Sequence, residues 1–471
     1  MWRTVLQLEW RILRRDRGAL AILGIFSLFL ILAAVAGGRQ ATLLADSQTR
    51  AQVSEENRLT SLGARLMELQ GETGPRRAKD PRDPVWMGKE GGIHLAVLPP
   101  APLASVAVGQ RDLHPQIVQV STEVELAAER ETETPMSGPT RLGTGAFDPA
   151  FLFVVLFPLV IIALSYELLS GERERGTLAM LLAQPVSQGD LVLGKASARA
   201  LALCTVTLIF ALIGLFVAGA DLTTAAAWGQ VALYASILVT WALFWFALAV
   251  WINARGQTSA GNALAMVGVW LVLVVVVPGL VHIAVDTVYP PPSKLELMHE
   301  AQEAAKDANQ EVAGLKGRHD VDTQTKTYAK NLVKAQDALL KRTEPLMHEL
   351  EETLSQRQAM VDWLRFLSPA IVVQLALEDV AGSGAVRHQR FDQQLDAFHP
   401  TFRAFYFDRI KSGSDLTAQD LQDRPELTFE EEPTGALTQR VLGGVLGILL
   451  LAAFLVATAW PRLKRIGRLT A

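Results

Sequence analysis

The sequence contains almost no cysteine. Cys204 is the single cysteine among 471 residues, and it lies inside an apolar run. One thiol excludes an intrachain disulfide, a thiolate metal cluster and a CxxC redox pair. The 8 histidines show no metal-ligand spacing either, His388 and His399 being the nearest pair outside the apolar runs. We therefore expect no metal in this chain, and any exported domain has to fold without disulfides.

The chain also lacks an excess of charge of either sign. Its 44 basic and 48 acidic residues leave a net charge of -4. Such a balance is typical of neither a nucleic-acid-binding protein nor an acid-tailed one, so no nucleic-acid partner is expected.

The apolar residues, 50% of the chain, are bunched rather than spread. A transmembrane helix needs about 20 consecutive apolar residues, and six stretches are long enough. We place the predicted spans at residues 19–37, 149–170, 200–219, 227–252, 259–284 and 441–460.

The basic N-terminal segment allows two interpretations. It could belong to a secretory signal, with the residues 34–36 (Ala-Val-Ala) as its cleavage site. The apolar run is longer than a usual signal core, however, so we favour a retained span preceded by an amphipathic helix over residues 1–18 at the membrane surface. Apolar residues recur at helical spacing in that segment: Trp2, Val5, Leu6, Trp10 and Leu13.

The distribution of Lys and Arg predicts the orientation. Both the N-terminal segment and the tail of residues 461–471 are basic, and cytoplasmic flanks retain positive charge. Six crossings return both ends to one side, so both termini are expected in the cytoplasm. The turn at residues 220–226 has one charge, Asp221, as expected for an outer loop.

This topology exports two segments. Residues 38–148 contain a leucine-rich helix around Leu62, then Gly/Pro-rich chain and strand-like runs at 93–98, 105–108 and 117–120, which predict a small mixed α/β domain. Residues 285–440 predict a mainly helical domain, with one helix carrying Leu295 and Met298 and a second over 323–364. A helical hairpin is favoured over an intermolecular coiled coil. The overall fold class is an all-α polytopic membrane protein with two extracytoplasmic domains.

An aromatic cluster marks the second exported segment. Phe398, Phe402, Phe405, Tyr406 and Phe407 lie within ten residues of one another. We interpret the cluster as core, with an amphipathic segment on the outer leaflet as the alternative.

Ionisable side chains are almost absent from the predicted spans. Proton- and sodium-coupled carriers need such groups inside the bilayer, so a secondary transporter is disfavoured. The run from Gly189 to Gly194-Lys195-Ala196 approaches the phosphate-loop pattern, but Ala196 replaces the magnesium-binding hydroxyl and no strand precedes it. We therefore predict no ATPase motif, no enzymatic activity and no cofactor in this chain, so its energy must come from another protein.

The segment joining the second and third spans, within residues 171–199, carries the candidate site. Glu172, Arg173, Glu174 and Arg175 are charged, and Gly176-Thr177 offers a break and a helix cap. An apolar stripe and a helix stop follow: Leu178, Leu181, Leu182 and Pro185. The stripe predicts either a helix lying on lipid or a plug that inserts into a groove on a soluble partner.

At these residues the chain resembles the ABC-2 family of ABC transporter permeases, in which Glu-Arg-Glu-x-Gly-Thr-Leu followed by Leu-Leu and Pro marks the cytoplasmic coupling helix. Residues 98–115, 145–148, 367–370, 381–382 and 387–388 further resemble a bacterial subfamily with large periplasmic insertions. The resemblance implies a type V exporter-like fold in the inner membrane, and a dimer with a second copy or a sister permease. It also implies a separate ATPase subunit that binds Mg-ATP under each permease.

By that resemblance Glu172 and Glu174 would face basic residues of the ATPase, and Leu178 and Leu181 would fill its groove. The expected function is export of a hydrophobic or amphipathic substrate, or mechanical transmission to the periplasm, where a further partner could dock. The alternative is a membrane scaffold or sensor that transports nothing. The family's short re-entrant helices between the last two spans are not expected here, because residues 285–440 are long.

Overall fold

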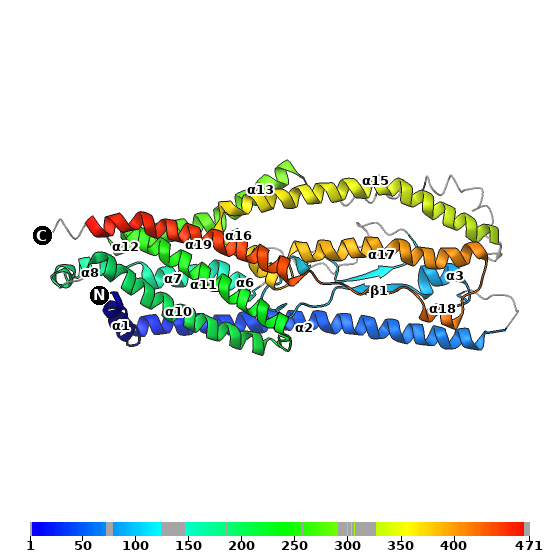
Figure 1. The fold of residues 1–471 in the computed structure, drawn as a ribbon, viewed down its shortest axis with the longest axis horizontal. Helices are drawn as coiled ribbons and strands as arrows, with labels where there is room; N and C mark the ends of the chain where they lie inside the picture. Colours follow the sequence, from blue (N-terminus) through cyan, green and yellow to red (C-terminus); the bar gives the residue numbers. More distant parts are fainter. Residues whose placement is uncertain are drawn as a thin grey trace.

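The computed structural model describes residues 2–71, 79–112, 114–123, 147–184, 187–256, 258–290, 299, 303, 306 and 326–465. The molecule is elongated (Figure 1). A bundle of long apolar helices forms one half, and an extension of helices around a small sheet forms the other. Both ends of the chain lie at the far end of the bundle.

The six predicted spans are confirmed, since six helical stretches of the described chain are long and apolar enough to cross a membrane. Four spans are single helices: α2 (Arg17–Glu68), α10 (Gln188–Val217), α11 (Ala225–Asn253) and α19 (Thr434–Arg465). The second span consists of α6 (Pro149–Phe151), η3 (Leu152–Leu156), α7 (Phe157–Ser165) and α8 (Ser170–Glu174). The fifth span consists of α12 (Ser259–Trp270), η4 (Leu271–Val276) and α13 (Val277–Val288).

The π-helical turns η3 and η4 have a common cause. Pro158 and Pro278 follow them closely, each at the second residue of the next α-helix. Proline lacks the N–H of the regular ladder, and a wider turn accommodates the missing bond.

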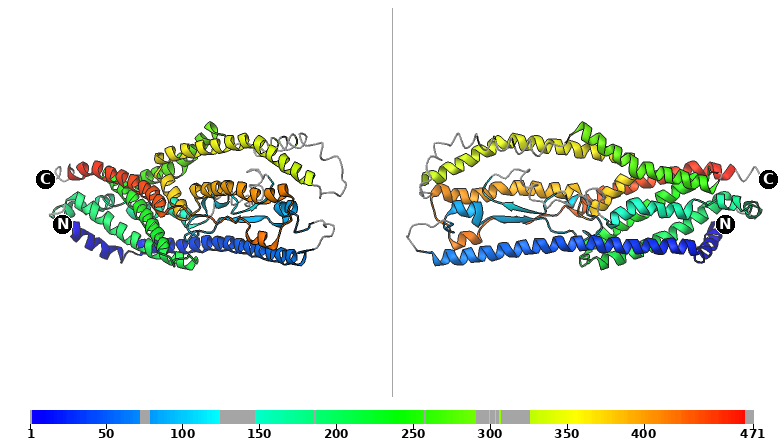
Figure 2. Two further views of the ribbon diagram at one scale, coloured as in Figure 1. Left: turned by 45° about the vertical axis from the view of Figure 1, so that its right-hand side comes forward. Right: turned by 180° about the vertical axis from the view of Figure 1, so that it is seen from behind.

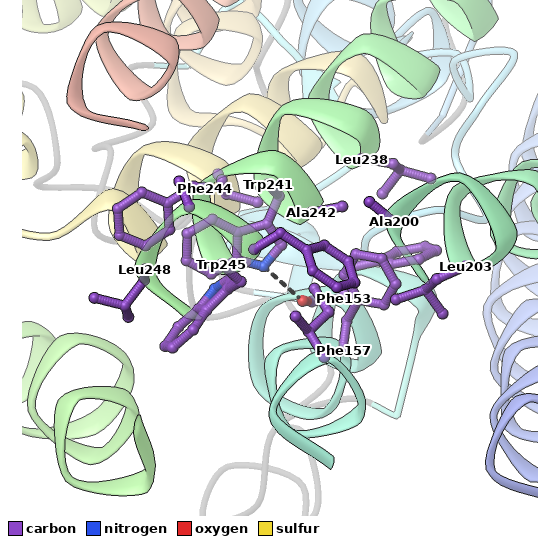
Figure 3. Packing of buried hydrophobic residues seen from close by; sticks show 14 of the residues in the cluster. Phe153, Phe157, Ala200, Leu203, Leu238, Trp241, Ala242, Phe244, Trp245 and Leu248 are labelled. Atoms are coloured by element: carbon purple, nitrogen blue, oxygen red, sulfur yellow. Dashed lines mark hydrogen bonds between the residues drawn. The ribbon is translucent and has the colours of Figure 1, made fainter. Parts of the chain in front are cut away.

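Helix α11 is the centre of the bundle. Trp241, Phe244 and Trp245 are at most 2% exposed, and the rings of Trp241 and Phe244 stack at 5.5 Å. The Trp241 indole N–H donates to the carbonyl oxygen of Phe153 at 2.9 Å, joining α11 to the second span (Figure 3). The fifth span and α19 instead turn large side chains outward, such as Ile283 and Leu450.

Helix α2 differs from the sequence prediction, which ends the first span at Gly37 and expects a separate helix around Leu62. The structure has one continuous helix of 52 residues. Gly37 and Gly38 do not end it but allow two close contacts. A Cβ on Gly37 would lie 2.1 Å from the carbonyl oxygen of Ser105, and one on Gly38 2.7 Å from Cα of Ala218.

The extension contains a two-stranded antiparallel sheet, β1 (His94–Val97) and β2 (Ile117–Val120), with His94 opposite Val120. It lies between α2 and α17 (Ala385–Ser412) (Figure 1). The short elements α3 (Pro84–Trp86), η1 (Met87–Gly91), η2 (Gly109–Asp112) and α18 (Ala418–Gln422) complete this part. The strand-like runs at 93–98 and 117–120 are therefore strands, whereas that at 105–108 is not.

The two segments predicted to be exported do not form two separate cores. Leu62 and Val120 from the first segment pack in one cluster with Phe402 and Tyr406 from the second. Apolar side chains of both segments are thus buried in one core, and a larger joint core buries a greater share of its surface. We call this joint body the distal domain; it comprises the second half of α2, residues 79–98 and 114–123, α17, α18 and residues 413–433.

The remaining helices link the distal domain to the bundle. Helix α15 (Lys326–Leu364) contains most of the predicted helix 323–364 and runs along the outside of α17 (Figure 2). The predicted helix with Leu295 and Met298 lies outside the described residues, so the hairpin stays a prediction. After η6 (Arg365–Leu367), α16 (Pro369–Val380) packs into the bundle against α11 and α19, with Leu377 fully buried. This part of residues 285–440 thus lies with the spans rather than with the distal domain.

Candidate coupling site

The candidate segment lies at the end of the bundle that holds both termini (Figure 1). After α8 the chain reverses at Gly176, whose φ of 73° is left-handed and favours glycine, and then forms α9 (Leu178–Leu182). The expected break is therefore at Gly176. Thr177, predicted to cap α9, gives it no side-chain cap; its hydroxyl donates to the backbone carbonyl and the carboxylate of Glu172.

Glu172 faces into the protein rather than toward a partner. Its Oε1 accepts a hydrogen bond from Lys195 Nζ at 2.8 Å and lies 3.2 Å from an Arg175 nitrogen. The Lys195 side chain is only 5% exposed and also lies 3.7 Å from a carboxylate oxygen of Glu9. Glu172 thus holds the coupling segment to α10 and, through Lys195, to α1 (Trp2–Leu13).

Glu174 and Arg173 hold the same segment to the start of the fifth span. The Glu174 carboxylate accepts from the amide of Ser259 at 2.6 Å and from its hydroxyl at 2.8 Å. Arg173 donates to the carbonyl oxygen of Gly256 at 3.3 Å. Both predicted ATPase-facing carboxylates therefore bind groups of their own chain: Glu172 pairs with a buried ammonium, and Glu174 satisfies an orphan N–H at the start of α12.

The apolar stripe of α9 is also turned inward. Leu178 and Leu181 pack partly against the main core, and Leu182 is half-buried. Met180 is the side chain that points outward, with 73% of its surface exposed. Pro185 lies outside the described residues. The exposed apolar group is thus one that the stripe did not include.

A buried amide network fixes the irregular backbone between α7 and α8. Asn253 Oδ1 accepts from the amide of Leu169 at 3.3 Å and from Asn262 Nδ2 at 3.1 Å. Asn262 also donates to the Ser170 hydroxyl, which bonds Ser259 at 2.9 Å. Buried polar groups need such partners, so the network joins the second, fourth and fifth spans at one point.

The near match to a phosphate loop has another role. Residues 188–217 are helical from Gln188 onward, so Gly194 and Lys195 lie on a helix face and not in a loop. Gly194 allows α1 to lie close, since a Cβ there would be 2.6 Å from a Val5 methyl carbon. Helix α1 accordingly buries Val5, Glu9 and Leu13 against the bundle. The predicted amphipathic helix therefore packs on protein with this face, and not on lipid alone.

The sequence reasoning missed three features: the amide network, the bridging Lys195 and the exposed Met180. The first two leave a signal, since Asn253 and Asn262 stand near the ends of two successive apolar runs and Lys195 follows a glycine in a helix-compatible segment. Within the described residues no three His, Cys, Asp or Glu side chains group to hold a metal. The arrangement is suited to transmitting movement, because Glu172 is bonded to Lys195 on α10 and Glu174 to Ser259 on α12, while Lys195 also lies close to Glu9 on α1.

Comparison with known proteins agrees with this architecture. The family model described as "ABC-2 family transporter protein" matches residues 3–460. The chain is similar to the "Probable ABC transporter permease protein NosY" of Stutzerimonas stutzeri, with 34% identity over 133 residues, 27% of this chain and 47% of that relative. It is also 43% identical over 58 residues to the protein of the same name from Pseudomonas aeruginosa, 12% of this chain and 21% of that relative. The matches span less than half of these relatives. Since the family model covers nearly the whole chain, the chain belongs to the ABC-2 transporter family and is a membrane permease subunit.

Proposed function

We propose that this permease works with a separate ABC ATPase subunit, which binds Mg-ATP and contacts the segment from Glu172 to Leu182. The observation that carries the proposal is the exposed tip of this segment. Met180 is 73% exposed and the side chain of Arg175, which contacts Glu172, is 56% exposed, while Glu172, Arg173 and Glu174 are bonded to groups outside the segment's tip. An apolar group beside a cation, on a rigid support, suits a groove on a soluble partner.

The bonds behind the tip would pass its movement on. Glu172 links the segment to Lys195 on α10, and Glu174 links it to Ser259 on α12. A displacement of α8 and α9 therefore pulls on the third and fifth spans together. Each bond joins charged or buried groups, which makes it costly to break and favours collective movement.

The orientation follows from this function. ATP is cytoplasmic, so the coupling segment and both termini would face the cytoplasm of a bacterium, and the distal domain the periplasm. The five arginines within residues 3–17 lie at the same end, in keeping with the retention of positive charge on the cytoplasmic side.

The purpose of the movement divides into two alternatives, export of a hydrophobic or amphipathic substrate and mechanical transmission. Helix α2 favours transmission. Its 52 residues make a rod of about 78 Å at 1.5 Å per residue, which runs without a break from beside α1 into the core of the distal domain. A tilt of the helix in the bundle would therefore displace its other end in the distal domain. The dimer with a second copy or a sister permease is part of the same proposal.

Substitution of Met180 tests the proposal. The full chain and a candidate ABC ATPase from the same organism are co-expressed, and co-purification and ATPase activity in nanodiscs are measured. We expect Met180→Asp to weaken the complex at least tenfold, or about 1.4 kcal/mol, because a charge would enter the groove. Met180→Leu should keep both signals, and so should Asp221→Lys in the turn between α10 and α11. Unchanged co-purification and activity of Met180→Asp would refute the assignment.

A further inference from the structure

A groove in the distal domain is not used by the coupling mechanism. It has a volume of about 540 Å³, within the range of about 300–1,000 Å³ usual for binding sites. One wall is α2, from Gln52 to Thr60; the floor is β1 with Leu95 and Val97; the opposite wall is the extended chain from Glu426 to Phe429.

The register of the sheet leaves one edge of β1 open toward this groove. The Leu98 amide donates to the carbonyl of its opposite residue, Gln116, at 3.0 Å. Directly opposed residues alternate between bonded and non-bonded pairs, so Ala96 and His94 bond β2, while Leu95 and Val97 turn their amides and carbonyls away from it. The Leu95 amide accordingly donates to Glu55 on α2 at 3.1 Å. Val97 has no backbone partner on that side within the described residues.

The opposite wall has the pattern of a strand without a partner. Glu426 and Thr428 are exposed and Leu427 and Phe429 half-buried, an alternation typical of extended chain on a core. Its contact with β1 is made through a side chain, since the Leu427 amide donates to His94 Nε2 at 3.0 Å. The His94 ring thus closes one end of the groove, and beyond it the two extended segments are not paired.

The groove is also acidic at its rim. Glu56 and Glu426 are exposed, and Glu56 has no partner among the described residues. The nearest guanidinium groups are used elsewhere. Arg58 donates to the carbonyl of Ile93, and Arg424 donates to that carbonyl and is shared between Glu55 and Glu426. Glu55, Glu56 and Glu426 therefore line the groove and no Lys or Arg side chain does; Glu55 is paired with Arg424 and His94, so the rim charge comes from Glu56 and Glu426.

We propose that this groove binds an extended, basic peptide segment of a partner protein, which adds as a third strand to the open edge of β1. An unpaired edge is a template for such addition, and main-chain bonds to Val97 would supply affinity while the carboxylates select positive charge. The four residues of β1 pair with a strand of about 13 Å. This site does not depend on the ATPase and stands apart from the proposed coupling.

The test uses the full chain in nanodiscs of zwitterionic lipid, with empty nanodiscs as the blank. The probe is a fluorescein-labelled octapeptide of alternating Lys and Val, followed by fluorescence anisotropy. An octapeptide of alternating Glu and Val tests the charge, and one of alternating Lys and Pro has the same charge but lacks every second N–H. We expect the Lys-Val peptide to bind at least tenfold more tightly than either, and the Val97 amide to exchange at least tenfold more slowly when it is bound.

Two variants localise the effect. Val97→Pro removes the outward N–H and should abolish binding, and proline is tolerated at sheet edges. A second variant, which leaves the backbone of β1 unchanged, separates loss of binding from a change in the strand. Glu56→Lys with Glu426→Lys changes exposed side chains only and should weaken binding at least tenfold. Equal binding of the Glu-Val peptide, or an unchanged exchange rate at Val97, would overturn the proposal. The proposal would also be overturned if a second copy of the chain occupied the groove and kept the peptide out.

Discussion

The coupling end and the distal domain are each built around a buried cation, and they use it differently. At the coupling end Lys195 lies between Glu172 and Glu9, at 2.8 and 3.7 Å. In the distal domain Arg424, 1% exposed, bonds the Glu55 carboxylate at 2.8 Å and two backbone carbonyls at 2.9 Å. An ammonium is a point charge that tolerates movement of its partners, whereas a guanidinium fixes several directions at once.

Under the proposed function, the difference separates a part that is expected to move from a part that is held in place. The Lys195 contacts join a short coupling segment to the helices beside it. The Arg424 contacts join the chain after α18 to α2 and to the turn before β1, which lie 369 and 332 residues away in sequence. The distal domain is thus specified by directional bonds, and the coupling end by charge.

Removal of Arg424 gives the largest expected effect. Arg424→Met leaves Glu55 buried with His94 but without its guanidinium, and the Gly92 and Ile93 carbonyls each keep one donor, Tyr406 and Arg58. Breaking a buried pair from one side costs about 3–5 kcal/mol, so we expect the distal domain to open while the spans persist. Hydrogen exchange of β1 and α17 in nanodiscs measures this. Lys195→Met should instead raise exchange in α1 and in the segment around Glu172, and leave β1 unchanged.

The matched control is Glu426→Gln. This side chain also touches Arg424, at 3.3 Å, but it is 64% exposed, and exposed pairs contribute little. Protection of β1 in Glu426→Gln should match that of the unchanged protein. If Arg424→Met were equally protected, the directional bonds would not specify the domain.

The spans were predictable because their signal is local. A run of about 20 apolar residues is visible in any window, and all six runs are helices in the structure. The end of the first span was not predictable, since Gly37 and Gly38 look like helix breakers in sequence. Their purpose appears only when Ser105 and Ala218 come close, which no local pattern encodes.

The distal core and the directions of the coupling residues escaped prediction for the same reason. Leu62 and Phe402 belong to segments that the sequence separates by four spans, and nothing local indicates their contact. The charged run of the candidate segment, Glu172 to Arg175, is visible in the sequence. Whether Glu172 points outward depended on Lys195, 23 residues away, which the sequence presents as part of a phosphate-loop-like run.

Acidification tests the distal domain through His388, which is 2% exposed. Burial, the largest cause, lowers the pKa of His388 to about 4, and the nearby His114 and Arg387 act in the same direction. Its hydrogen bonds suit a neutral ring, because Gln116 donates to Nε2 at 3.0 Å and Nδ1 donates to the Gly384 carbonyl at 3.1 Å.

The sign of the effect follows from the two pKa values. The unfolded chain, with an ordinary pKa of 6.5, takes up a proton before the folded chain does. The stability from the neutral ring is therefore complete above pH 6.5 and is lost as the pH falls toward 4, by an amount of the order of 3 kcal/mol. As the pH is lowered from 6.5 to 4, we expect the free energy of opening to decrease more steeply in the unchanged protein than in His388→Gln. Parallel pH profiles would contradict the buried neutral histidine.

The smallest effect is expected when the same substitution, Phe to Leu, is made in the distal domain, which water surrounds, and in the bundle, which lipid surrounds. Phe402 in the distal domain and Phe157 in the bundle are both 0% exposed and each lies beside two aromatic rings. Phe402→Leu loses packing and hydrophobic burial, about 1–2 kcal/mol. Phe157→Leu loses packing alone, because lipid is as apolar as the core, so we expect about half of that loss. Local opening free energies from hydrogen exchange measure both, and an equal or larger loss at Phe157 would show that the bundle is held by water exclusion as the distal domain is.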